Sequence, residues 1–174
     1  RRQRQMCIRD RYHIGYLLGP RINAGGRVGK STHGANLLIN KNPRDVFKLA
    51  SELDIFNKER QLLEKEVFDK ILFKIGNKIH DPVIIIDGKG WHEGVIGIVA
   101  SRIKDKFNKP VIIITVSGEG VGKASARSVV GFDIGSAIIS ATHEKILIKG
   151  GGHKMAGGFS IAVENIDCLL YTSD

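Results

Sequence analysis

Two short runs of β-branched residues, VIIID at 83–87 and VIIIT at 111–115, constrain this chain more than any other feature. Continuous apolar runs of this length are typical of strands that are buried on both faces of a sheet. The segment between them, 94–107, places apolar residues at helical spacing among charged ones, which predicts an amphipathic helix. A strand, a helix and a second strand in this order predict two parallel strands and an α/β fold.

The segments that follow extend this domain. We expect a polar strand at 123–130, a helix at 132–144, a glycine-rich turn at 150–152 and a last strand at 159–163. The expected architecture is therefore a long connecting helix followed by an α/β domain with a mixed or parallel sheet.

The segment upstream of the first strand has a different pattern. Residues 12–41 are rich in glycine and polar residues, and we expect a loop that runs into a short helix at 32–38. Asn42 and Pro43 suit a helix N-cap and first turn, and apolar residues recur beyond them at three- and four-residue steps. A continuous helix of ~33 residues is about 50 Å long, too long for a compact domain. It either breaks near 54–57 or connects two domains.

The charge balance favours a polyanionic partner. The chain has 27 Lys and Arg against 18 Asp and Glu, a net charge of +9. No apolar run approaches the ~20 residues that span a bilayer, so no membrane partner is expected. Two cysteines exclude a disulfide scaffold and a four-cysteine zinc site.

Both ends of the chain look foreign to it. QMCIRDR at 5–11 and CLLYTS at 168–173 match translations of opposite strands of one transposon end used in sequencing libraries. We therefore expect 1–11 and 168–174 to be non-native adapter translation and leave them out of the fold reasoning. The remaining residues, 12–167, carry 22 basic and 16 acidic side chains, a net charge of +6, and no cysteine.

The common catalytic and nucleotide-binding patterns are incomplete. The P-loop pattern lacks its first glycine both before Gly29-Lys30-Ser31 and before Gly122-Lys123. The six histidines form no short-spaced pair, and no close pair of aspartates suggests a two-metal centre. We expect no metal site in this chain.

Four glycine-rich blocks instead point to anion binding. They are GPRINAGGR (19–27), GKGWHEGVIGIVASRI (88–103), ASARSV (124–129) and GGGHKMAGGF (150–159). Glycine lets phosphates approach backbone amides, and each block adds Arg, Ser, His or Lys donors. A single block is as easily a structural turn, but four blocks in a basic chain favour phosphate binding.

These blocks resemble the RecJ family of single-stranded-DNA-specific exonucleases, within the DHH phosphoesterase superfamily. The resemblance extends over 12–167 and implies that 12–41 is the end of a catalytic DHH domain. It further implies that 42–81 is a connecting helix and 82–167 a DHH-associated domain that binds nucleic acid, with GGGH as its signature. The family's metal-ligand motifs are missing here, so the resemblance implies a fragment that is inactive alone.

The resemblance also implies roles for particular residues. Arg21 and Arg27 would bind phosphate, with Asn23 ordering their loop. Ser125 and Arg127, which belong to the DHH-associated domain, would bind phosphates of the DNA strand.

His153, on a tight turn after three glycines, would act at the scissile phosphate as a donor or transition-state stabiliser. Trp91 either stacks on a base or packs in the core, and His92 either contacts DNA or caps the helix that follows. The remaining candidates belong to the last glycine-rich block and are Gly150, Gly151, Gly152 and Lys154.

For the parent protein, the resemblance implies a bacterial cytoplasmic enzyme that degrades single-stranded DNA from the 5′ end. Its Mn or Mg ions would be bound by the DHH catalytic domain of the same parent chain, and none by this chain. Two alternatives stay open: a related DHH phosphoesterase acting on oligoribonucleotides or cyclic dinucleotides, and a structural module whose glycines only form turns.

Overall fold

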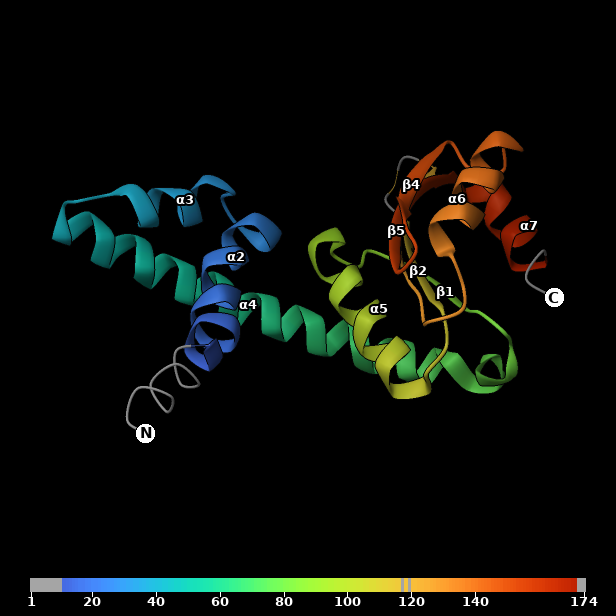
Figure 1. Ribbon diagram of the computed structural model, residues 1–174, viewed down its shortest axis with the longest axis horizontal. Coiled ribbons are helices and arrows are strands. Elements are labelled where there is room, and N and C mark those ends of the chain that lie inside the picture. Colours follow the sequence, from blue (N-terminus) through green and yellow to red (C-terminus); the bar gives the residue numbers. More distant parts are fainter. Residues whose placement is uncertain (1–10, 117, 119, 172–174) are drawn as a thin grey trace. The chain divides into compact units, whose positions relative to one another are not determined.

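The structure is a computed structural model that describes residues 11–116, 118 and 120–171 (Figure 1). The chain divides into two units, Arg1–Leu63 and Glu64–Asp174. Residues 1–10 and 172–174, most of the expected adapter translation, lie outside the described residues. The non-native origin of both ends stays a prediction.

The first unit is helical where a loop was expected. It contains η1 (His13–Leu18), α2 (Gly19–Val28) and α3 (Thr32–Ile39), so the expected helix at 32–38 forms but the expected loop before it does not. The reason is close helix packing: a Cβ on Gly34 would lie 2.6 Å from the carbonyl oxygen of Ile22. The glycines that favoured a loop allow two backbones to approach each other.

A single helix, α4 (Pro43–Ile75), follows and has 33 residues. It begins as expected, because the side-chain oxygen of Asn42 accepts a hydrogen bond from the backbone N–H of Arg44 at 3.1 Å. The helix is unbroken through 54–57, and the boundary between the two units falls within it, after Leu63. It leads into the 3₁₀ turn η2 (Gly76–His80), where Gly76 has a positive φ of 43°.

The second unit holds a five-stranded sheet in the order β1-β2-β3-β5-β4. Strands β1 and β2 are parallel and joined by helix α5, as predicted, and every other neighbouring pair is antiparallel. The elements of this unit are β1 (Ile84–Lys89), α5 (Glu93–Phe107), β2 (Val111–Val116), β3 (Val121–Arg127), α6 (Ile134–His143), β4 (Lys149–His153), β5 (Ala156–Ala162), η3 (Val163–Asn165) and α7 (Ile166–Tyr171).

The two helices α5 and α6 cover opposite faces of the sheet (Figure 1). Helix α5 packs on β2 and β3, and helix α6 packs on β4 and β5. Ile84, Ile85 and Ile86 in β1 are all buried, which confirms that this β-branched run lies between two covered faces. The core on the α6 side includes Ile112, Ile114, Ala124, Ala126, Ile138, Phe159 and Ile161.

The expected glycine-rich turn at 150–152 is wrong, because these residues form most of strand β4. The chain turns two residues later, at Lys154 and Met155, and β4 pairs with β5 through Gly152 and Gly157. A Cβ on Gly150 would lie 2.6 Å from Ile138 of α6, and one on Gly157 would lie 2.4 Å from the same side chain. These glycines therefore allow α6 to approach the hairpin closely, and they do not form its turn.

Alternate glycines of β4 should respond differently to substitution. A Cβ on Gly152 would lie 2.4 Å from the backbone oxygen of Ala156 and 2.6 Å from the Cα of Gly157, whereas Gly151 has open space around it. Gly152→Ala should therefore destabilise the unit by about 1–3 kcal/mol. Gly151→Ala, the matched control, should change the free energy of unfolding little. Urea unfolding followed by the fluorescence of Trp91, the single tryptophan, measures both, and equal effects would contradict this assignment of the glycines.

Candidate functional site

One face of the strands β3, β5 and β4 is lined by polar side chains. Residues two apart on a strand point to the same side, and so do paired residues on antiparallel neighbours. In β3 these are Lys123, Ser125 and Arg127, which pair with Ser160, Gly158 and Ala156 of β5. The β5 residues pair in turn with Lys149, Gly151 and His153 of β4. We call this surface the polar face and define it as Lys123, Ser125, Arg127, Lys149, His153 and Ser160.

Helix α6 covers the other side of β4 and β5, and the polar face is exposed at Lys123, Lys149 and His153. Gly151 points to the polar face, and a Cβ added to it would have no atom within 4 Å, while Gly150 and Gly157 point toward α6. Between α5 and β4 the polar face contains a hollow of about 510 Å³. The polar residues that line it are Glu93, Lys123, Ser125, Lys149 and Ser160. We call it the polar hollow.

Ser125 and Arg127 form a fixed pair on this face. Arg127 donates from Nη1 to the Ser125 hydroxyl at 3.1 Å and to the backbone oxygen of Ala126 at 2.8 Å. Gly97 of α5 lies against both, since a Cβ there would be 2.9 Å from Arg127 Nη2 and 2.9 Å from Ser125 Oγ. The missing side chain of Gly97 thus leaves room for the guanidinium, a planar group suited to binding phosphate with two hydrogen bonds.

His153 ends β4 at the tight turn of the hairpin, and its side chain is exposed, as expected. Its Nδ1 accepts a hydrogen bond from the backbone N–H of Met155 at 3.3 Å, which leaves Nε2 as a donor in the neutral ring. His153 and Arg127 pair with the same β5 residue, Ala156, so their Cα atoms are about 10 Å apart, two strand spacings. Lys154 follows in the turn and is exposed.

Trp91 and His92 have structural contacts at the start of α5. Trp91 is only 7% exposed and lies against Gly88, and its backbone oxygen accepts a hydrogen bond from Thr115. The packing alternative for Trp91 therefore fits better than base stacking. His92 is the N-cap of α5 and accepts a hydrogen bond from the Gly94 N–H at 3.1 Å.

The candidates Arg21, Asn23 and Arg27 all lie on helix α2 of the first unit, and not on a loop. Arg21 forms an ion pair with Asp54 at 2.9 Å and donates to the backbone oxygen of Leu17 at 2.7 Å. Hydrogen bonds from Lys58 and Arg21 hold the pKa of the Asp54 carboxyl below its usual value. A role of these three residues in phosphate binding stays a prediction.

The structure adds residues that the sequence motifs did not single out. Lys123, Lys149 and Ser160 line the polar hollow beside Ser125. The signal in the sequence was the two-residue spacing of Lys123, Ser125 and Arg127, which places all three side chains on one face of a strand. Lys149 and Ser160 join them only through strand pairing.

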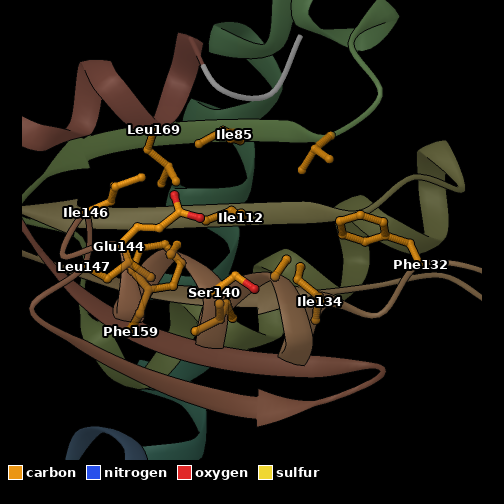
Figure 2. Close-up of a pocket in the computed structure, with 14 residues that line it drawn as sticks. Ile85, Ile112, Phe132, Ile134, Ser140, Glu144, Ile146, Leu147, Phe159 and Leu169 are labelled. Atoms are coloured by element: carbon orange, nitrogen blue, oxygen red, sulfur yellow. The ribbon is translucent and has the colours of Figure 1, made fainter.

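A second hollow lies on the α6 side of the sheet and has a different character. Figure 2 shows apolar side chains around it, among them Ile85 and Ile112 from the sheet and Ile134 from α6, with Ser140 and Glu144 as polar neighbours. Its volume is about 250 Å³. Its lining offers no cation for an anionic ligand.

The described residues hold neither a metal centre nor a membrane-spanning helix. Within 11–116, 118 and 120–171, no three His, Cys, Asp or Glu side chains gather in a way that holds a metal ion. In the same part of the chain, no helix is long and apolar enough to cross a membrane.

Known proteins are similar to this chain in both sequence and fold. A family model described as the DHHA1 domain matches residues 69–173. The single-stranded-DNA-specific exonuclease RecJ of Bacillus subtilis is 35% identical over 158 residues, 90% of this chain and 20% of that protein. RecJ of Escherichia coli is 35% identical over 156 residues, 85% of this chain and 27% of its own length.

Solved structures of RecJ proteins also match this chain. RecJ from Thermus thermophilus in complex with Mg²⁺ matches with a TM-score of 0.80 and 30% identity, over 91% of this chain and 24% of that one. An exonuclease RecJ bound to manganese matches with a TM-score of 0.79 and 30% identity, over 91% and 39%. The chain spans between a fifth and just over a quarter of the curated relatives it matches.

The buried position of Trp91 can be tested directly. With 7% of its surface exposed, its fluorescence in the folded chain should be quenched by iodide far less than that of free N-acetyltryptophanamide. Unfolding in urea serves as the control, because it should restore full quenching. Quenching in the folded chain as strong as that of the free compound would contradict the packing assignment.

Proposed function

The chain belongs to the DHHA1 domain family, and from this we propose that it is part of a metal-dependent single-stranded-DNA exonuclease that degrades DNA from the 5′ end. In that enzyme the chain contributes DNA phosphate binding. The observation that carries the proposal is the polar face, which gathers Ser125, Arg127 and His153 on an open side of the sheet. Its similarity to RecJ proteins, whose name specifies single-stranded DNA, supports the choice of substrate.

Phosphate binding follows from the donors on this face. Arg127 presents a guanidinium that is oriented by Ser125 and Ala126, so little side-chain freedom is lost when it binds an anion. Ser125 adds a hydroxyl, and the His153 ring adds an N–H at Nε2. Contacts to phosphate carry no sequence information, so binding through them should be independent of DNA sequence.

His153 is proposed as the supporting residue at the scissile phosphate. The neutral ring donates one hydrogen bond from Nε2, which suits a non-bridging oxygen that gains negative charge in the transition state. Gly150, Gly151 and Gly152 act by shaping the strand that presents His153, and Lys154 adds a positive charge in the adjoining turn.

The metal ions of the reaction belong to another part of the parent enzyme. The residues described here do not fit a metal centre, since no three ligand side chains gather in them. Two solved RecJ relatives are described with Mg²⁺ and Mn²⁺. We propose that a DHH catalytic domain of the same parent chain binds Mg or Mn in a bacterial cytoplasmic enzyme, and that this chain alone is inactive.

The remaining candidates complete the proposal for the first unit. Arg21 and Arg27 on α2 are proposed to bind phosphate, with Asn23 beside them. Arg21 would have to exchange its partly buried ion pair with Asp54 for a phosphate.

Substitution of Arg127 tests the DNA-binding role. Arg127→Ala should weaken binding to a fluorescent oligodeoxynucleotide by about tenfold or more, since hydrogen bonds to charged groups contribute ~1.5–3 kcal/mol. Fluorescence anisotropy measures the dissociation constant, and log K should fall with log salt by about 0.7 per contacted phosphate. Arg44→Ala, which removes the same charge from the exposed start of α4, should change the dissociation constant little.

Three results of this titration would count against the proposal. A dissociation constant that does not respond to salt would contradict phosphate binding. Binding to a dinucleotide as strong as binding to an oligonucleotide of about 12 residues, within the range of single-strand sites, would favour the related phosphoesterases. No binding at low salt would favour a structural module.

The missing metal ligands predict the absence of nuclease activity. The purified chain should release no mononucleotides from a 5′-labelled single strand in the presence of Mn²⁺ or Mg²⁺, because the described residues contain no metal centre. Gel analysis of the labelled strand checks this. Activity that persists after repurification and disappears on adding a chelator would overturn the assignment of the metals to another domain.

A further inference from the structure

The polar hollow is lined by a hydroxyl group that has no hydrogen-bond partner in the described part of the chain. Ser160 lines the hollow and is only 9% exposed. Its side chain makes no hydrogen bond with any residue that the structure describes, and its hydroxyl oxygen is not among the fully buried atoms, so a ligand in the hollow can reach it. A hydroxyl that is unpaired and reached from a hollow is suited to contact a ligand there.

Two lysines flank this hydroxyl. In the sheet, Ser160 of β5 pairs with Lys123 of β3 on one side and with Lys149 of β4 on the other. Paired residues of neighbouring strands lie about 5 Å apart, so the two ammonium groups extend on either side of the Ser160 hydroxyl. Two cations and a hydroxyl donor on three adjacent strands favour an anion over any neutral ligand.

Glu93 is the acidic group of the hollow. Its carboxylate forms an ion pair with Lys123 at 2.8 Å, and both side chains are about half exposed. Such an exposed pair contributes little to stability, so an incoming anion can take the place of Glu93. Glu93 therefore lowers the affinity for an anion without closing the site.

We propose that the polar hollow is a second phosphate subsite, which binds the phosphodiester next to the one held by Arg127 and Ser125. This rests on the function proposed above. Lys123, Ser125 and Arg127 stand at two-residue steps along β3, about 6.8 Å apart. That step is similar to the distance between successive phosphates of an extended single strand. The backbone of the strand then runs along β3, and Lys149 and Ser160 complete the second subsite.

Single substitutions in the full chain test the subsite by fluorescence anisotropy with an oligodeoxynucleotide of about 12 residues. Lys123→Ala and Lys149→Ala should each reduce the slope of log K against log salt by about 0.7, which is about fivefold in affinity at 0.1 M salt. Lys123→Arg and Lys149→Arg should retain the slope. The control is Lys106→Ala on the exposed side of α5, which removes the same charge away from the hollow and should leave the slope unchanged.

Glu93→Gln should have the opposite effect and strengthen binding, because it removes the acidic group from the hollow. Its control is Asp105→Asn, at the other end of the same helix, where the carboxylate pairs with Lys104. If Glu93→Gln strengthens DNA binding and Asp105→Asn does not, the effect cannot come from a purely structural role of Glu93. The thermal unfolding temperature of each variant, measured in parallel, identifies any loss of folding.

The outcomes separate the two proposals. If the chain binds single strands and Arg127→Ala weakens binding, but the two lysine variants behave like Lys106→Ala, the second subsite is wrong and the proposed function stands. If the unchanged chain does not bind single strands at low salt, both are wrong.

Discussion

The contact between helix α6 and the glycines of the β4–β5 hairpin determines how this domain presents the polar face. Ile138 lies where a Cβ of Gly150 or Gly157 would be, at 2.6 Å and 2.4 Å. Only glycine permits that approach, because any side chain would have to displace α6. With one face of the hairpin sealed in this way, the other face stays open, and its side chains are Lys149, Ser160 and His153.

Helix α5 completes the arrangement from the opposite side of the sheet. It packs on β2 and β3, and the missing side chain of its Gly97 leaves room for Ser125 and the guanidinium of Arg127. The polar hollow lies between this helix and β4. Two helices lie on opposite faces of one sheet, each in close contact with the strands where a glycine lacks a side chain, and they leave the polar face exposed between α5 and the hairpin.

Much of the second unit was predictable from the sequence, because its signals are periodic and local. The runs 83–87 and 111–115 predicted the parallel strands, and the amphipathic segment between them predicted α5. Asn42 and Pro43 predicted the start of α4. Ser125, Arg127 and His153 were named from their motifs, and strand pairing brings them to one face. Lys149 and Ser160 were missed, since no local pattern connects residues of different strands.

The sequence by itself determined which residues lack a side chain and which carry a charge, and from this came the prediction of an anionic ligand. It did not determine what the glycines are for. A residue without a Cβ suits a turn, a phosphate loop or a close backbone contact equally well, and the choice depends on atoms distant in the sequence. Tertiary structure decided that Gly25 and Gly34 allow helices to pack closely. It also decided that Gly150 and Gly157 contact Ile138, and that Trp91 packs on Gly88. These contacts are non-local, so only the folded chain specifies them.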